Sequence, residues 1–414
     1  MKKTLPLVSA IRAIPQLCPL HNHIESFAED WAKQGYSDYT IDQKVRLLTN
    51  LDGWLLRRQI KIEDFAEEHI ETFLRYRRSH GHSRGGDRST LRSVLGTLRA
   101  TKITVTSLPT AICDANVIDN LQTRFRQYLI DERGLNAATI TWYVSETRTF
   151  LLKCFGKRPA SMAEISSRDV TQYVLHRARL TSPRTAQRTV TALRGFLRFL
   201  HQRGEIETNL ASSVPRVANW TAAGLPKYLP AADVERLLDG CNGKTNEARR
   251  NRAILLLLAR LGLRAGEVVH LTLDDIDWDA GELLICGKGG RHDRLPMPID
   301  VGRALAAYIR YARPSCQSRR VFIRLNAPHQ GLSGASNISF VVRQALKRVD
   351  LRPVFRGSHL LRHSLATRML RAGASLTEIG KILRHELPST TAIYAKVDLA
   401  ALRALAQPWP GGEA

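Results

Sequence analysis

The feature that most restricts the fold is a helical pattern that occurs twice along the chain. GYSDYTIDQKVRLLTNLDG at residues 35–53 aligns with GLNAATITWYVSETRTFLL at 134–152, which places Thr40–Ile41 opposite Thr139–Ile140. In both segments apolar residues recur every three or four positions, which is the spacing of one buried helix face. A repeat of this size indicates two similar helical bundles in tandem. The alternative, that any two small helical bundles resemble each other this much, stays open.

The correspondence continues through the rest of both bundles, where further apolar positions pair in the same order. The pairs are Val45 with Val144, Leu51 with Phe150, Phe65 with Ile165, Ile70 with Val170, Phe73 with Tyr173, Leu91 with Val190, Val94 with Leu193, and Leu98 with Leu197. Residues 101–117 and 218–230 interrupt the helical period and contain proline, so both are predicted linkers. The predicted parts are an N-terminal arm at 1–22, a first helical module at 23–105, a second at 118–215 and a third domain at 226–408.

The third domain carries cationic side chains in short, distinct contexts. His359 and Arg362 are three residues apart in GSHLLRHSLATRML, so on a helix they share one face. LGLRAGEVVHL places Arg264 just after an apolar helix. ICGKGGRHDRLPMP predicts two short strands around a glycine-rich turn that holds Lys288. Taken singly, each residue also has a structural interpretation, such as a helix-end arginine or a turn lysine.

Near the C-terminus, the stretch RHELPSTTAIY adds His385 and ends at Tyr394. Arginine side chains hold phosphate oxygens through two hydrogen bonds at once, and a tyrosine hydroxyl can attack phosphorus to form an ester. The whole set therefore indicates phosphoryl transfer. No carboxylate cage for a metal accompanies these residues, so neither a metal nor another cofactor is expected.

The order Arg264, Lys288, His359, Arg362, His385, Tyr394 resembles the tyrosine recombinase (phage integrase) family in its Xer-like form. The resemblance implies a mainly α fold with a small β component. Two tandem helical SAM-like (core-binding) bundles would precede a mixed α/β integrase-type catalytic domain. The first bundle would then be an addition that a minimal Xer-type protein lacks.

The same resemblance assigns roles to the main catalytic residues. Tyr394 would be the nucleophile, and Lys288 would be the general acid that protonates the leaving 5′-oxygen. Arg264 and Arg362 would stabilise the charge that grows on the non-bridging oxygens. His359 would accept the proton from the tyrosine or hydrogen-bond the phosphate.

Four further residues have supporting places in this scheme. Glu267 would hold Arg264, and His385 would hydrogen-bond the phosphate. His363 is expected to pack or to support its neighbours rather than to catalyse. Arg384 stands where the family usually has a glycine, which brings the geometry of this turn into question, and it could add a phosphate contact.

The charge of the chain favours a polyanionic partner. Sixty-two lysines and arginines against 38 acidic residues give a net charge of +24. Double-stranded DNA is the expected partner, with a homotetramer on DNA implied by the resemblance and other recombinases as further candidates. Six scattered cysteines without a C-x-x-C, and an N-terminus interrupted by Arg12 and two prolines, favour a reduced, cytoplasmic, nucleoid-associated protein without a membrane segment.

The predicted function is site-specific DNA recombination or integration through a 3′-phosphotyrosine intermediate. A recombinase of a mobile element that works with partner recombinases is a subclass compatible with the additional first module. Two alternatives stay open. One is a DNA-relaxing enzyme like a type IB topoisomerase, and the other is a catalytically inactive DNA-binding accessory protein.

Overall fold

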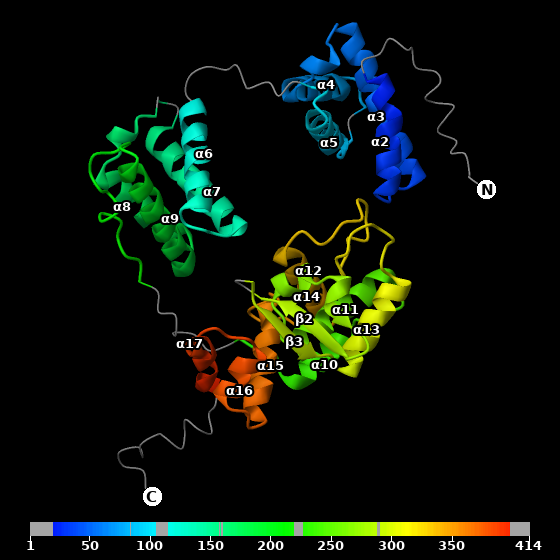
Figure 1. Cartoon of the computed structure of the whole chain (residues 1–414), viewed down its shortest axis with the longest axis vertical. Helices are drawn as coiled ribbons and strands as arrows, with labels where there is room; N and C mark the ends of the chain where they lie inside the picture. Colours follow the sequence, from blue (N-terminus) through cyan, green and yellow to red (C-terminus); the bar gives the residue numbers. More distant parts are fainter. Residues whose placement is uncertain are drawn as a thin grey trace, which may run out of the picture. The chain divides into compact units, whose positions relative to one another are not determined.

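The computed structural model describes residues 20–82, 84–104, 115–156, 158, 160–218, 227–287 and 290–397. Contacts divide the chain into two compact units, Met1–Thr106 with Gly224–Ala414 and Ser107–Ala223. Helices dominate, and the described residues form one small sheet, which confirms the predicted mainly α class (Figure 1). Most of the arm predicted at 1–22 lies outside the described residues, and the domain limits stay a prediction. No helix in the described ranges is both long and apolar enough to cross a bilayer.

Between residues 20 and 104, the described part of the first bundle forms four helices around its own apolar core. Ser37 begins the second of these helices as its N-cap, because its side chain accepts a hydrogen bond from the Thr40 backbone N–H. Ile24, Trp54 and Phe73 are among the side chains buried in the core. The elements are α2 (His21–Lys33), α3 (Asp38–Arg57), the 3₁₀ turn η1 (Ile62–Asp64), α4 (Glu67–Ser79) and α5 (Asp87–Ala100).

The second bundle has the same elements in the same order. Asn136 takes the place of Ser37, since its side chain accepts a hydrogen bond from the Thr139 backbone N–H. Aromatic rings fill its core, where Phe125 and Phe196 pack edge to face with centroids 5.0 Å apart. The elements are α6 (Ala115–Asp131), α7 (Ala137–Phe155), η2 (Met162–Glu164), α8 (Ser167–Leu180) and α9 (Pro183–Gln202).

The two bundles agree with the predicted internal repeat residue by residue. Every apolar pair named from the sequence is buried in both copies. Gly35 and Gly134 both adopt positive φ angles, +86° and +55°, at the turn before the capped helix. A glycine reaches this left-handed conformation without the steric cost that a Cβ atom brings. The repeat therefore extends from the core to the turns.

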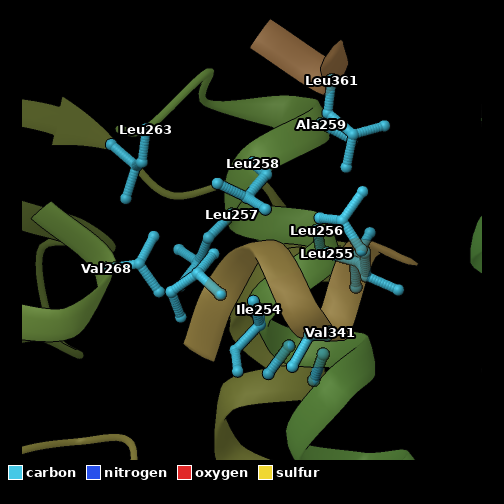
Figure 2. Packing of buried hydrophobic residues seen from close by; sticks show 14 of the residues in the cluster. Ile254, Leu255, Leu256, Leu257, Leu258, Ala259, Leu263, Val268, Val341 and Leu361 are labelled. Carbon is cyan, nitrogen blue, oxygen red and sulfur yellow. The ribbon is translucent and has the colours of Figure 1, made fainter. Parts of the chain in front are cut away.

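The third part of the chain surrounds one long apolar helix, α11. Ile254 to Leu258 of this helix are all buried, and Figure 2 shows them packed with Val341 of α14 and Leu361 of α15. The helices are α10 (Ala231–Asp239), α11 (Asn246–Arg260), α12 (Ala265–His270), α13 (Ile299–Tyr311), α14 (Ala335–Arg348), α15 (His359–Arg371), α16 (Leu376–Ile382) and α17 (Pro388–Thr391), with 3₁₀ turns η3 (Leu273–Asp275) and η5 (Ala392–Val397).

A three-stranded antiparallel sheet belongs to this part, in the order β1–β2–β3. The two predicted strands are present as β2 (Glu282–Cys286) and β3 (His292–Pro296), with Leu283 opposite Leu295. The short strand β1 (Ile276–Asp277) extends the sheet beyond the prediction. Lys288, which was predicted to lie in the turn between these strands, is outside the described residues.

Candidate active site

Arg362 connects three segments that are distant in sequence. It lies one turn into α15, and its side chain is almost completely buried, with 3% of its surface exposed. The guanidinium donates hydrogen bonds to the carbonyl oxygen of Gly262, before α12, and to that of Leu383, after α16. Burial, and then the positive charge of Arg264, lower the pKa of Arg362 to about 10. It therefore remains a cation at neutral pH.

Arg264 is held by Glu267 at the start of α12. The backbone N–H of Arg264 donates to Glu267 Oε2 over 2.8 Å, and its Nη1 donates to Oε1 over 2.7 Å. Glu267 is 6% exposed, so this carboxylate is a buried anchor. The predicted contact between the two residues is present. One face of the guanidinium is thereby fixed while the side chain keeps about a third of its surface exposed.

Arg384 contributes to the same anchor in a way that the sequence did not predict. Its Nη2 donates to Glu267 Oε2 over 2.8 Å, and its carbonyl oxygen accepts from Arg264 Nη2 over 3.0 Å. Burial by itself would raise the pKa of Glu267, but the charge of Arg384 and the hydrogen bonds from Arg264 outweigh it and lower that pKa. Arg384 therefore positions Arg264. In this conformation the guanidinium of Arg384 binds the Glu267 carboxylate and is not free to bind a phosphate.

The backbone at Arg384 explains why a glycine is usual in this turn. Its φ angle is +56°, in the left-handed region that disfavours side chains with a Cβ atom. We expect Arg384→Gly to unfold at higher urea than Arg384→Ala, with a difference of about 1 kcal/mol in the free energy of unfolding. Both variants lose the ion pair with Glu267, so the comparison isolates the backbone.

A control for this comparison is the same pair of substitutions at Arg368, an exposed position within α15. Glycine is less favourable than alanine inside a helix by about 1 kcal/mol, so the order of stability should be reversed there. An alanine variant at 384 as stable as the glycine variant would show that the turn carries no strain in solution.

The phenol of Tyr394 is buried against His363. Tyr394 belongs to η5, has 1% of its surface exposed and lies among Leu365, Ile379 and Leu383. Its hydroxyl oxygen is 2.8 Å from His363 Nδ1. Burial raises the pKa of Tyr394 to about 12, although the positive charge of Arg362 opposes the rise. The phenol is therefore protonated at neutral pH in this conformation.

This arrangement adds a contact that the sequence did not predict. His359 was expected to accept the proton from the tyrosine or to hydrogen-bond the phosphate, and His363 was expected to pack or to support its neighbours. The structure places His363 in contact with the hydroxyl, and the ring of His359 is centred 6.4 Å from that of His363. The two histidines are one helical turn apart on the same face of α15, so their spacing in the sequence does not show which of them meets the phenol.

His385 lies in the loop after α16 and lines a cavity of about 640 Å³. Its Nδ1 atom is 2.7 Å from Thr391 Oγ1, which orients the ring. The cavity lies beside the β2–β3 hairpin, and its charged lining residues are mainly cationic. They are Arg264, Arg291, Lys381 and Arg384 against Asp293 and Glu386. This cavity can accept an anionic group, with Arg264 and His385 of the predicted set at its wall.

Acid is expected to destabilise this site through two histidines. Burial, the largest cause in both, lowers the pKa of His363 and of His385 to about 4 from 6.5. The folded state thus binds these protons less well than the unfolded state, so stability is complete above about pH 6.5 and is lost as the pH falls toward 4. Thermal melts across this window should show a shallower acid slope for a His363→Gln/His385→Gln variant than for the unaltered chain.

The exposed His270 supplies the comparison for the acid measurement. His270→Gln removes one histidine outside the site and serves as the matched variant. Equal slopes for the double variant and the unaltered chain would show that neither buried histidine is responsible.

Comparison with known proteins assigns the fold around this site. The model described as "Phage integrase family" matches residues 227–400, and the one described as "Phage integrase, N-terminal SAM-like domain" matches residues 123–204. Together these spans cover more than half of the chain. The chain belongs to the phage integrase family. Both matched spans begin after the first bundle, whose role they leave open.

Relatives of this integrase include "Putative integrase/recombinase y4rA" of Sinorhizobium fredii, which is 41% identical over 393 residues and 95% of each chain. Tyrosine recombinase XerD of Mycobacterium tuberculosis is 32% identical over 69% of this chain and 95% of its own. The solved structure of the XerH recombinase bound to palindromic difH substrate shares the fold, with a TM-score of 0.55 at 18% identity over 72% of this chain and 89% of its own. Family membership supports site-specific DNA recombination.

Proposed function

We propose that this integrase is a site-specific recombinase that cuts DNA with Tyr394. The phenolic oxygen attacks a backbone phosphorus, the P–O5′ bond breaks, and a 3′-phosphotyrosine and a free 5′-hydroxyl result. A 5′-hydroxyl of another strand then attacks the phosphotyrosine and releases Tyr394. One P–O bond forms for each that breaks, so the cycle needs no external energy source. The observation that carries the proposal is the 2.8 Å contact between the Tyr394 hydroxyl and His363, next to Arg362.

The protein groups around the phenol support this chemistry. Burial lowers the pKa of His363 to about 4, so the imidazole is neutral at pH 7 and its Nδ1 is available to accept the phenolic proton as Tyr394 leaves its resting place. Arg362 has five N–H donors, and its two carbonyl contacts leave others for a phosphate oxygen. Arg264, fixed by Glu267, approaches the same phosphate from the cavity. For Lys288, the role of general acid stays a prediction from the sequence.

The resting conformation is not the reacting one. Tyr394 is almost fully buried, and it is not among the residues that line the cavity beside Arg264 and His385. We therefore propose that DNA binding shifts α17 and η5, so that the phenol enters the cavity while the arginines take the phosphate. Coupling exposure of the nucleophile to DNA binding would prevent reaction with free phosphate compounds.

Double-stranded DNA is the proposed substrate. The net charge of +24 suits a polyanion, and two structures that share the fold are described as bound to a palindromic substrate and to a core site. These are XerH on difH and a lambda integrase dimer on a COC′ core site, the latter with a TM-score of 0.51 at 17% identity. We extend the proposal to four protomers on two duplexes, which would exchange one pair of strands at a time. Movement of a mobile element is one use of this reaction.

A capture experiment tests the function and separates it from its alternatives. The protein is denatured rapidly in its host cells and isolated, and the DNA ends covalently attached to it are sequenced. One recurrent end is expected for a site-specific recombinase. Attached ends scattered over the genome would instead indicate a DNA-relaxing enzyme of the type IB topoisomerase kind, and the absence of attached DNA would indicate an accessory protein.

A further inference from the structure

The first bundle has a cavity of its own, with a volume of about 720 Å³, between α3, α4 and α5. Its lining is strongly cationic. The lysine and arginine residues are Lys44, Arg46, Arg57, Arg77 and Arg84. Asp87 is the carboxylate among the described residues that line it. This cavity, called here the α3–α5 groove, is distinct from the candidate active site.

The single carboxylate of the groove is already engaged. Asp87 is buried and forms an ion pair with buried Arg77, with 3.3 Å between Oδ2 and Nε. It also accepts a hydrogen bond from the backbone N–H of Arg84 over 3.1 Å. Arg46 pairs with Asp42 at the exposed rim, where an ion pair contributes little and exchanges easily. The groove therefore keeps an excess of positive charge after its internal pairs are counted.

Lys44 is the clearest example of a positive charge in the groove without a carboxylate partner among the described residues. Its ammonium group lies 4.3 Å from the centroid of the Tyr36 ring and 4.8 Å from that of Trp31, and it donates to Thr90 Oγ1 over 3.3 Å. Within the described residues, no carboxylate forms an ion pair with it. Burial lowers the pKa of Lys44, which means that the folded chain disfavours its charge. An anion bound in the groove would relieve this cost.

The second bundle has a buried carboxylate at the aligned place. There Glu146 is buried and accepts two hydrogen bonds of 2.8 Å from Arg177 and one of 2.9 Å from Thr189. The repeat aligns Arg177 with Arg77 and Thr189 with Thr90, so both partners are kept in the first bundle. The position of Glu146, however, is occupied by Leu47.

In the first bundle Asp87 takes over the pairing with Arg77, whereas Thr90, the counterpart of Thr189, accepts a hydrogen bond from the Lys44 ammonium group. We propose that the α3–α5 groove binds the phosphate backbone of double-stranded DNA and gives the integrase a contact with DNA outside the two parts that the family models match. Cations in a groove recognise phosphates without reading bases, so the contact adds affinity and position rather than sequence preference. The proposal rests on the proposed function only in taking DNA as the substrate.

The test uses the full-length chain and a fluorescent duplex of about 40 base pairs of arbitrary sequence, with affinity measured by anisotropy at several salt concentrations. The groove variant is Arg46→Gln/Arg57→Gln/Arg84→Gln, in which all three side chains are exposed. Each phosphate contact contributes about 0.9 to the slope of log affinity against log salt, so the variant should lose about 2 to 3 from the slope. Affinity should fall by about tenfold or more at 0.1 M salt.

A matched variant removes the same charge elsewhere on the bundle. Lys33→Gln/Lys61→Gln/Arg75→Gln replaces three exposed cations that do not line the groove, and its salt slope should stay near that of the unaltered chain. Thermal melts confirm that both variants fold. Equal slopes for the two triple variants would overturn the proposal. The slopes are measured without cleavage, so a failure of covalent capture by the unaltered chain would count against the proposed function and not against the groove.

Discussion

Tyr394→Phe is expected to abolish covalent capture of DNA completely while DNA affinity stays unchanged. The substitution removes only the oxygen that would attack phosphorus and keeps the ring that packs among Leu365, Ile379 and Leu383. Loss of the hydrogen bond to His363 should cost only about 1 kcal/mol of unfolding free energy. The measurement is the yield of protein attached to a nicked duplex that carries the DNA end recovered from cells, separated on a denaturing gel.

Tyr308→Phe is the matched control for this variant. Tyr308 is also fully buried, and its hydroxyl accepts a hydrogen bond from the Ile323 backbone N–H over 3.1 Å while its ring stacks on Phe322. This hydroxyl makes a hydrogen bond within the core, so its removal should lower the free energy of unfolding and leave capture intact. Capture that persisted in Tyr394→Phe would remove Tyr394 as the nucleophile, whatever the rest of the site does.

Arg264→Gln is expected to slow cleavage by about 10² to 10³, which corresponds to roughly 3 to 4 kcal/mol of activation free energy. Its guanidinium is oriented by Glu267 and by the carbonyl of Arg384, so it can face a phosphate without further ordering. Glutamine keeps a hydrogen-bond donor but lacks both the positive charge and the two-point geometry. The single-turnover rate on the nicked duplex measures the effect.

A variant at Arg260, four positions earlier, is the control that distinguishes a catalytic effect from a structural one. It donates to both oxygens of Glu235, at 2.6 and 2.8 Å, and to Asp300 at 2.8 Å, all within the protein. Arg260→Gln should therefore reduce stability while the cleavage rate of the folded fraction changes little. If Arg264→Gln cleaved as fast as Arg260→Gln, the place of Arg264 at the phosphate would be refuted.

The Tyr394→Phe and Arg264→Gln predictions both assume that Tyr394 leaves its buried position before it reacts. The phenol has a pKa of about 12 and lies outside the cavity that Arg264 and His385 line, so under the proposed function the described conformation is a resting one. Release of η5 by DNA would bring the phenol toward cations that lower its pKa. A resting state of this kind would explain why Tyr394 is as buried as a core residue although its hydroxyl contacts a histidine side chain. The hydroxyl of Tyr308, by contrast, accepts a hydrogen bond from a backbone N–H.

Much of the fold could be predicted because it depends on local periodicity. The repeated three-four spacing located the helices of both bundles, and the structure adds Ser37 and Asn136 as N-caps at equivalent positions of the repeat. Strands β2 and β3 followed from the glycine-rich turn between them. The two-residue strand β1 was missed, because a segment this short carries no periodic signal of its own.

The sequence by itself determined the family, the helical repeat and the identity of the cationic and phenolic side chains, since these depend on residue type and spacing along the chain. The tertiary structure decided which groups meet. His363 contacts Tyr394, and Arg384 shares Glu267 with Arg264 across more than a hundred residues. Spacing along one helix gives the face on which a residue lies, whereas the partner of that face is set by how separate segments pack.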